Sequence, residues 1–203
     1  MKSELEIDAT VIIPVFNDRE SLLRALASLR TQTYPRSKFE VVVVDNASEP
    51  PVQVKESFLV RLQIIRCDRP GSYAARNAGA AQAWGDVLVF LDADCFPEPN
   101  WLAEGVSALR RGQGQCIVGG TVRVLPPEPR TGVGLYQYVV GFQQEENIRE
   151  KHFSATANLF CYADQYRLVG PFEEGLLSGG DREWSWRARQ RGLEVVYAPN
   201  AVV

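Results

Sequence analysis

Two aspartates separated by a single residue, Asp92 and Asp94, are the side chains in this sequence best suited to chemistry. They directly follow the apolar segment Asp86–Leu91. If the chain stays extended there, side chains two positions apart point to the same side, so both carboxylates would face one ligand. Such hard oxygen donors suit Mg²⁺ or Mn²⁺, which in turn binds phosphate oxygens. The plainer alternative is a polar turn before Pro97.

Four short apolar segments would position this pair. Their composition is that of buried strands, and helical patterns separate them, which predicts an α/β fold with a mostly parallel central sheet flanked by helices. The segments are Thr10–Val15, Phe39–Val44, Leu62–Ile65 and Asp86–Leu91. Ligands of such sheets bind beyond the carboxyl ends of the strands. The first candidates for a site are therefore the residues just after them, which are Phe16 and Asn17, Asp45 and Asn46, residues 66–69, and residues 92–94.

Two helices are expected between these strands. The first presents an apolar face over Leu22–Leu29 and would be capped by Asn17 or Asp18. The second would run over Tyr73–Trp84 with Ser72 as its cap.

The second half of the chain is less regular. We expect a helix within Pro97–Arg110 and another over Asp181–Gln190, with Thr131–Lys151 partly helical and mobile. The strands expected there are Gln115–Leu125, Thr156–Tyr162 and Leu193–Tyr197, and Pro126–Pro129 is expected to be a loop.

The composition excludes broad attraction to nucleic acid or to a charged membrane surface. Lys and Arg total 22 and Asp and Glu total 25, so the net charge is −3 and an anionic ligand needs a local site. No apolar stretch is long enough to span a bilayer, and Met1–Asp8 lacks an apolar signal segment. The four cysteines are widely spaced, which is typical of free thiols in a cytoplasmic protein. A place at the inner face of a membrane is the alternative location.

Four motifs in this order resemble the successive signatures of the family-2 inverting glycosyltransferases. They are Pro14–Asn17, Val44–Ser48, Ala74–Gly79 and Leu91–Asp94. The resemblance runs from about residue 8 to the end and implies a GT-A fold. It further implies one catalytic domain over residues 1–203, with a Rossmann-like nucleotide-sugar-binding half at 8–95 and an acceptor-binding half at 96–203.

For the nucleotide half, the resemblance implies a nucleotide-diphosphate sugar, UDP-linked in the commonest family pattern, with Mn²⁺ or Mg²⁺ as cofactor. The residues expected around the nucleotide are Pro14, Val15, Phe16, Asn17, Asp45, Arg76 and Asp92. Asp45 would accept a hydrogen bond from the base, although a strand-ending Asx turn is its structural alternative. Arg76 would bind the diphosphate. Asp94, with Asp92 at the ribose or the water shell, would hold the metal.

The resemblance also suggests the general base of the reaction. The segment Ser178–Arg187 resembles the acidic stretch before the family's acceptor-side helix, where relatives often carry Glu-Asp and this chain has Gly180 and Asp181. Asp181 is therefore the expected base and Glu183 the fallback. A helix N-cap is the structural alternative for Asp181.

On the acceptor side we expect Trp101, Thr156, Asn158 and Gly180, although packing explains Trp101 at least as well and a structural role explains Thr156 and Asn158 equally well. The acceptor hydroxyl itself is open: polysaccharide, lipid carrier, protein or small molecule. Synthesis of a cell-envelope polysaccharide by a hexosyltransferase is the process that the resemblance suggests. The sequence ends abruptly at Ala201–Val203, in what reads as the start of another apolar segment, so we expect it to be cut from a longer protein, with membrane segments beyond its end left open. Relatives often add a metal-binding histidine after the last strand, and this sequence stops before one could appear, so we expect the metal to bind weakly or only together with the nucleotide.

Two other functions fit parts of the pattern. A nucleotidyltransferase shares an α/β nucleotide fold and an aspartate–metal pair, but no glycine-rich loop with a lysine follows the first strand. A non-catalytic module that binds nucleotide sugars would keep the nucleotide motifs and lack a working base.

Overall fold

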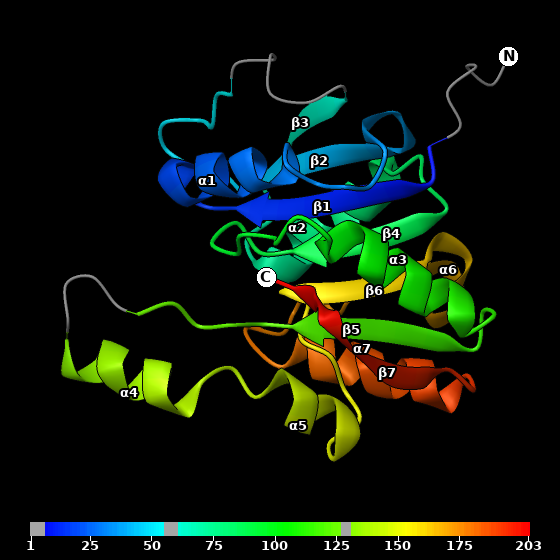
Figure 1. Cartoon of the computed structure of the whole chain (residues 1–203). Coiled ribbons are helices and arrows are strands. Elements are labelled where there is room, and N and C mark those ends of the chain that lie inside the picture. Colours follow the sequence, from blue (N-terminus) through cyan, green and yellow to red (C-terminus); the bar gives the residue numbers. More distant parts are fainter. Residues whose placement is uncertain (1–6, 55–60, 127–130) are drawn as a thin grey trace, which may run out of the picture.

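The computed structural model describes residues 7–54, 61–126 and 131–203, and they form one seven-stranded sheet with helices on both faces (Figure 1). The strands are β1 (Ala9–Val15), β2 (Phe39–Asp45), β3 (Leu62–Arg66), β4 (Val87–Leu91), β5 (Cys116–Thr121), β6 (Asn158–Tyr162) and β7 (Glu194–Val202). The helices are α1 (Arg19–Leu29), α2 (Ser72–Gln82), α3 (Trp101–Arg111), α4 (Gly132–Val140), α5 (Gln144–Arg149), α6 (Ala163–Val169) and α7 (Gly180–Gln190), with a short 3₁₀ helix, η1, at Arg36–Lys38.

The strand order is β3-β2-β1-β4-β6-β5-β7. β1 is parallel to β2 and β4, β2 to β3, and β5 to β7, whereas β6 runs antiparallel to both of its neighbours, β4 and β5. The expected mostly parallel α/β sheet is therefore confirmed. Because the two flanking strands of β6 point the same way, the carboxyl ends of the other six strands share one edge of the sheet.

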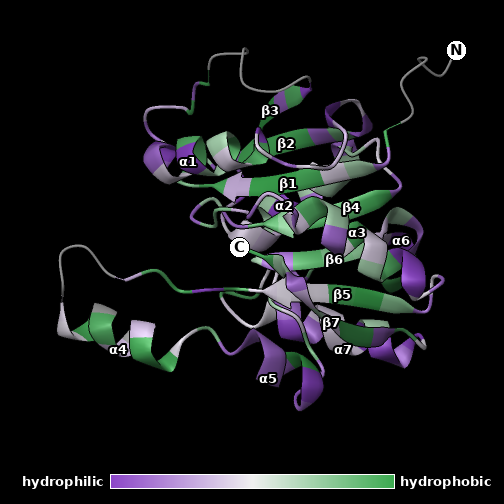
Figure 2. Ribbon diagram, in the orientation of Figure 1, coloured by the Kyte–Doolittle hydropathy of each residue, from purple (hydrophilic) through white to green (hydrophobic). Residues whose placement is uncertain are grey.

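Cover on both faces explains the continuous apolar sequences of β1, β2 and β4, whereas β3, at the edge of the sheet, is half-buried to exposed and not the buried strand expected from its sequence. Val11 and Ile13 of β1 pack in one core with α1 and α3, while Ile12 between them packs in a second core with α2, α6 and α7. Figure 2 shows the same arrangement as hydrophobic central strands between helices whose outer faces are hydrophilic. Because both faces of the central strands are covered by helices, a ligand can reach the sheet only at the ends of its strands.

The two expected caps of the first half differ in outcome. Asp18 caps α1, since its Oδ1 accepts a 3.0 Å hydrogen bond from the backbone N of Ser21. α2 begins at Ser72 itself, and its cap is Gly71 at φ 104°, a conformation that glycine adopts without strain. The expectation that Ser72 caps α2 is therefore wrong by one residue.

In the second half, β5 is shorter than the expected Gln115–Leu125, and β7 extends beyond the expected Tyr197 to Val202. α4 and α5 confirm that Thr131–Lys151 is partly helical. Figure 1 shows α4 away from the sheet, on a long excursion of the chain after β5. Residues 1–6 of the expected signal-free N-terminus and 127–130 of the expected loop lie outside the described residues.

Three findings concern membrane spans, cysteines and clusters of metal-binding side chains. Within residues 7–54, 61–126 and 131–203, no helix has the length and apolar character needed to cross a bilayer. All four cysteines are free thiols. Over the same ranges, no cluster of three or more His, Cys, Asp and Glu side chains could hold a metal ion by itself.

Candidate functional site

A pocket of about 530 Å³ lies at the carboxyl edge of the sheet, where β1, β2 and β4 end. It is lined by Pro14, Val15, Phe16, Asp18, Asn46, Ala47, Asp68, Pro70, Gly71, Ser72, Arg76, Asp92, Ala93 and Asp94. The loops that line the pocket follow β1, β2, β3 and β4, as expected for ligands of a parallel sheet. We call this the carboxyl-edge pocket.

Arg76 forms the charged wall of this pocket. It is only 5% exposed, and its Nη2 donates a hydrogen bond to Asp92 Oδ1. Its Nε is buried and has no hydrogen-bond partner in the part of the chain that the structure describes. A buried donor without a partner costs free energy comparable to a lost hydrogen bond. The described part of the protein therefore leaves one donor of the Arg76 guanidinium unsatisfied.

Asp94 is the free carboxylate of the site. The chain does not stay extended after β4, as the sequence argument assumed; it turns, with the backbone N of Cys95 donating to Asp92 O at 3.1 Å. Both aspartates nevertheless line the pocket, Asp92 paired with Arg76 and Asp94 with no side-chain partner on another described residue. Loss of hydration first, and the nearby charge of Asp92 second, raise the pKa of Asp94. A cation would relieve both effects.

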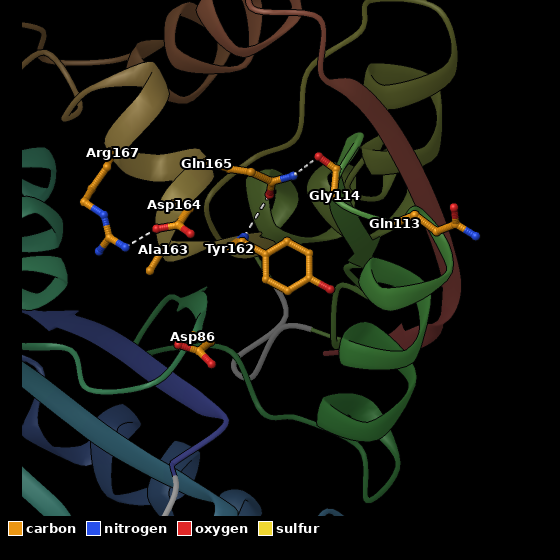
Figure 3. A pocket seen from close by; sticks show the side chains of 8 residues that line it. All are labelled: Asp86, Gln113, Gly114, Tyr162, Ala163, Asp164, Gln165 and Arg167. Atoms are coloured by element: carbon orange, nitrogen blue, oxygen red, sulfur yellow. Dashed lines mark hydrogen bonds and ion pairs between the residues drawn. The ribbon is translucent and has the colours of Figure 1, made fainter. Parts of the chain in front are cut away.

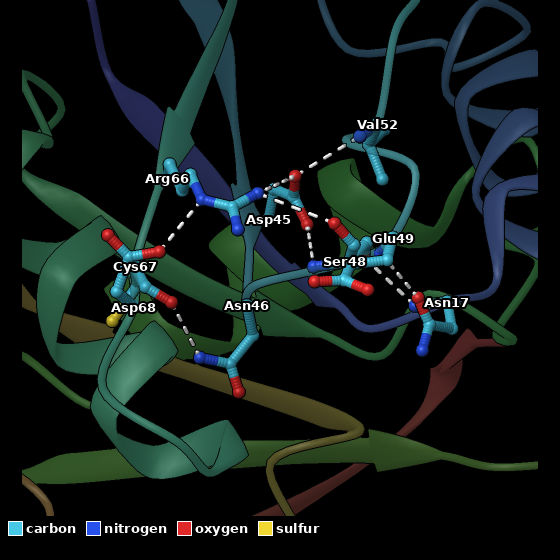
Figure 4. A network of polar contacts seen from close by, with 9 residues as sticks. All are labelled: Asn17, Asp45, Asn46, Ser48, Glu49, Val52, Arg66, Cys67 and Asp68. Atoms are coloured by element: carbon cyan, nitrogen blue, oxygen red, sulfur yellow. Dashed lines mark hydrogen bonds and ion pairs between the residues drawn. The ribbon is translucent and has the colours of Figure 1, made fainter.

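Asp45 does not reach the pocket. It is 3% exposed, and its carboxylate accepts hydrogen bonds from the backbone N of Ser48 at 2.9 Å, from the backbone N of Val52 at 3.1 Å and from Arg66 Nη1 at 3.4 Å (Figure 4). Burial alone would raise its pKa, but the hydrogen bonds and the Arg66 charge outweigh burial, so the pKa of Asp45 lies below its ordinary value. In this structure Asp45 holds the loop after β2, which is the turn given as its alternative, and its contact with a base stays a prediction.

The loop after β1 divides its residues between two tasks. Phe16 is 62% exposed and, with Pro14 and Val15, presents an apolar surface to the pocket. Asn17, at φ 53°, joins this loop to the loop after β2: its Oδ1 accepts from Glu49 N at 2.8 Å, and its N donates to Ser48 Oγ at 2.9 Å (Figure 4). Asn17 therefore stabilises the two loops beside the pocket and does not itself line the pocket.

Asp181 and Glu183 lie in the first turn of α7. Asp181 does not cap the helix, because the helix begins at Gly180 with Gly179 as its cap. Its Oδ1 accepts from its neighbour Arg182 N at 2.9 Å and lies 3.5 Å from Tyr73 Oη of α2. Glu183 is engaged by Arg187 through two hydrogen bonds, at 2.6 and 2.9 Å. Within the described part of the chain, the contacts of Asp181 therefore involve only one of its two carboxylate oxygens, whereas Arg187 engages both oxygens of Glu183.

Residues 10–163 match the family model described as glycosyl transferase family 2. The chain belongs to this family. Among curated proteins, it is 38% identical over 198 residues to glycosyltransferase AglE of Haloferax volcanii. The matched region covers 95% of this chain and 65% of that relative. The chain thus spans less than two thirds of the length of that relative.

Solved structures show the fold of this family-2 chain. S. aureus TarS 1-349 in complex with UDP-GlcNAc matches with a TM-score of 0.71 at 18% identity, covering 97% of this chain and 58% of that one. Mannosyltransferase PcManGT from Pyrobaculum calidifontis, in complex with GDP-Man and Mn²⁺, matches with a TM-score of 0.73 at 22% identity, covering 98% of this chain and 56% of that one. The expected GT-A fold is confirmed.

Three of the residues expected on the acceptor side are interior residues of the family-2 chain. Trp101 is fully buried, and its Nε1 donates to Asn158 Oδ1 at 2.8 Å. Asn158 Nδ2 donates in turn to the carbonyls of Thr121 and Ala201, at 2.8 and 2.9 Å. Thr156 is 3% exposed. Asn158 thus joins β5, β6 and β7 and Trp101 packs against it, which is the structural alternative for these two residues, whereas acceptor contact by any of the three stays a prediction.

Asn46 and Asp68 line the pocket and were identified only as positions after strands. Asn46 organises the loop before α2, since its Nδ2 donates to the carbonyls of Cys67 and Arg69 and its Oδ1 accepts from Gly71 N. No spacing within the sequence predicts this, because the partners are more than 20 positions away. Position after a strand was the available signal.

Proposed function

We propose that this family-2 chain transfers a sugar from a nucleotide-diphosphate sugar to an acceptor hydroxyl, with inversion at the anomeric carbon. The observation that carries the proposal is that two side chains with unsatisfied polar groups line one pocket. They are Arg76, whose buried Nε has no partner among the described residues, and Asp94, whose carboxylate has no side-chain partner there. An anionic diphosphate would accept hydrogen bonds from the Arg76 guanidinium, and the Asp94 carboxylate would bind a divalent cation that neutralises the diphosphate. In the proposal, residues 8–95 bind the donor and residues 96–203 the acceptor.

A UDP-sugar is the donor that we propose to test first. The TarS and PcManGT complexes contain UDP-GlcNAc and GDP-Man, so both ligands are nucleoside diphosphate sugars. In this chain the exposed ring of Phe16 offers a face on which a base can stack. The Asp68 side chain lines the same pocket, is exposed and can hydrogen-bond the base or the ribose, while Asn46 holds the loop before α2 in place.

The pocket residues fit a divalent cation, Mn²⁺ or Mg²⁺, as hard oxygen donors. Asp94 would hold the ion directly and Asp92 would orient its water shell, with diphosphate oxygens and water completing the coordination. When bound, the ion supplies positive charge that stabilises the departing diphosphate.

We propose Asp181 as the general base. Its carboxylate would accept the proton of the acceptor hydroxyl while that oxygen bonds to the anomeric carbon and the bond from that carbon to the diphosphate oxygen breaks. The electron pair leaves with the diphosphate, so no second carboxylate acts as an acid. Glu183 is the weaker candidate because Arg187 occupies both of its oxygens.

A donor panel tests the function. The full chain with Mn²⁺ is incubated with UDP- and GDP-sugars, and release of nucleoside diphosphate is measured with and without candidate acceptors. We expect release from one nucleotide class, lost on chelation and in Asp181→Asn. Release of pyrophosphate from a nucleoside triphosphate would instead identify a nucleotidyltransferase. Tight binding without turnover, unchanged in Asp181→Asn, would identify a binding module.

A further inference from the structure

The N-terminus of α7 is capped by a side chain of another helix. The first N–H groups of a helix have no partners within it, and the cap residue Gly179 has no side chain to offer. Tyr73 of α2 takes that place: its Oη accepts from Gly180 N at 2.8 Å and from Asp181 N at 3.4 Å. The same Oη lies 3.5 Å from Asp181 Oδ1, the outer limit of a hydrogen bond. One hydroxyl thus contacts both the backbone and the carboxylate of the proposed base.

The Tyr73 ring is itself fixed in place. It is 7% exposed and stacks on Phe172, with ring centroids 5.9 Å apart and an interplanar angle of 30°. The guanidinium of Arg76 lies 5.5 Å from the centroid of the Tyr73 ring, and Arg76 bonds Asp92 in the carboxyl-edge pocket. Tyr73 therefore stands between the wall of the proposed donor site and the proposed base.

Gly180 is the residue that lets the ring approach. A Cβ placed on Gly180 would lie 2.6 Å from Tyr73 Cε2 and 2.7 Å from Cζ, closer than real Cβ contacts come. Because the ring is held by Phe172 and buried, it cannot move aside cheaply. A side chain at position 180 and the Tyr73 ring exclude each other.

We propose that Tyr73 is a positioning residue for Asp181, and that glycine at position 180 is required for Tyr73 to act. The inference rests on the proposed function, because it concerns the group assigned there as the base. Tyr73 does not touch the reacting atoms; it sets the direction of the carboxylate that receives the proton. Loss of its hydroxyl should therefore slow turnover and leave donor binding nearly unchanged.

The test measures nucleoside diphosphate release from UDP-GlcNAc and GDP-mannose with Mn²⁺, using Tyr73→Phe and Asp181→Asn. We expect Tyr73→Phe to lower kcat by about 10-fold, a part of the 10²–10⁴ that a general base supplies, with donor KM within about 2-fold. The matched control is Tyr166→Phe, which also removes a part-buried tyrosine hydroxyl beside Phe172, here bonded to Asn77 Oδ1 at 2.6 Å. It should keep kcat within about 2-fold, since Tyr166 does not contact Asp181.

A double-mutant cycle tests the pairing with Gly180. Gly180→Ala should lower kcat about as much as Tyr73→Phe in the wild-type background, because the added Cβ displaces the ring. In the Tyr73→Ala background the same substitution should cost little more. Equal losses in both backgrounds would overturn the pairing. Melting temperatures of all variants show whether kcat refers to folded protein.

The outcomes separate the two proposals. If Asp181→Asn is inactive and Tyr73→Phe turns over like the wild type, the positioning role is wrong and the proposed function stands. If Asp181→Asn is as active as the wild type, the assigned base is wrong and the role of Tyr73 falls with it. If the wild type releases nucleoside diphosphate from no donor, the proposed function fails first.

Discussion

Two pockets of similar volume, at opposite edges of one sheet, differ in how far their polar groups are satisfied. The carboxyl-edge pocket measures about 530 Å³ and the opposite one about 560 Å³. The opposite pocket, shown in Figure 3, is lined by Asp86, Gln113, Gly114, Tyr162, Ala163, Asp164, Gln165 and Arg167. Volume alone would not distinguish them.

The buried polar groups do distinguish them. Gln165, 5% exposed, accepts from Tyr162 N and donates to the carbonyls of Gly114 and Cys116, so its amide is fully used. Arg76, also 5% exposed, has an Nε without a partner among the described residues, and Asp94, which lines the same pocket, has no side-chain partner among them. An unpaired buried donor and an unpaired carboxylate do not stabilise the fold, which points to a ligand that satisfies them. Unsatisfied polar side chains therefore distinguish the candidate site from the opposite pocket, whereas pocket volume does not.

The largest expected effect comes from removing the free carboxylate. Asp94→Ala should lower metal-dependent turnover by about 100-fold or more, because it removes the proposed direct ligand of a Lewis acid worth several kcal/mol. Nucleoside diphosphate release and the shift in Tm caused by Mn²⁺ plus UDP measure it. Asp164→Asn in the opposite pocket is the control and should change neither. An undiminished Tm shift in Asp94→Ala would remove the metal assignment.

The second effect concerns the unsatisfied donor. Arg76→Met should raise donor KM or the Kd of UDP by about 10- to 100-fold, the worth of hydrogen bonds from a charged group. Isothermal titration with UDP and Mn²⁺ measures it. Arg167→Met, which breaks the ion pair with Asp164 in the opposite pocket, should leave the Kd unchanged. Equal losses in the two variants would mean that the comparison between the pockets carries no functional information.

Two aspartates should then act on stability with opposite signs. The pKa of Asp45 is lowered in the folded state, so its ionised form stabilises the fold above the ordinary pKa, and this contribution is lost as pH falls through the folded pKa. Asp45→Asn should lower the free energy of unfolding by about 1–3 kcal/mol at pH 7 and flatten the fall of Tm below about pH 4.

For Asp94, whose pKa is raised, the stabilising state is the protonated one, and that stability is lost as pH rises through the folded pKa. Without metal, Asp94→Asn should therefore raise Tm at pH 7. Thermal melts from pH 2 to 8 measure both variants. Tm changes of the same sign at pH 7 would contradict the distinction between a structural and a ligand-binding carboxylate.

The smallest effect is expected at the pocket rim. Phe16→Ala should raise donor KM by about 3- to 10-fold, the worth of one aromatic stacking contact. Trp84→Ala is a matched control, since Trp84 is 64% exposed against 62% for Phe16 but lies outside the pocket lining. KM values for the donor identified by the panel measure both. A loss in Trp84→Ala equal to that in Phe16→Ala would assign the effect to general destabilisation.

Sequence by itself determined the sheet and its ligand edge. Apolar runs without polar alternation, separated by helical patterns, predict a mostly parallel sheet covered on both faces, which brings residues 14–16, 46 and 92–94 to one edge, although the sequence did not predict that β6 runs antiparallel. The motif order added the family, which the match over residues 10–163 confirms.

Only the tertiary structure decided which polar side chains are already in use. Asp45 and Asp94 look alike in sequence, each following a buried strand, yet one is bonded from 7 residues away by Val52 N and from 21 away by Arg66 while the other is free. Trp101 and Asn158, 57 positions apart, satisfy each other inside the core. The reason is physical: whether a polar group is available depends on partners that arrive through long-range folding, and spacing along the chain does not record them.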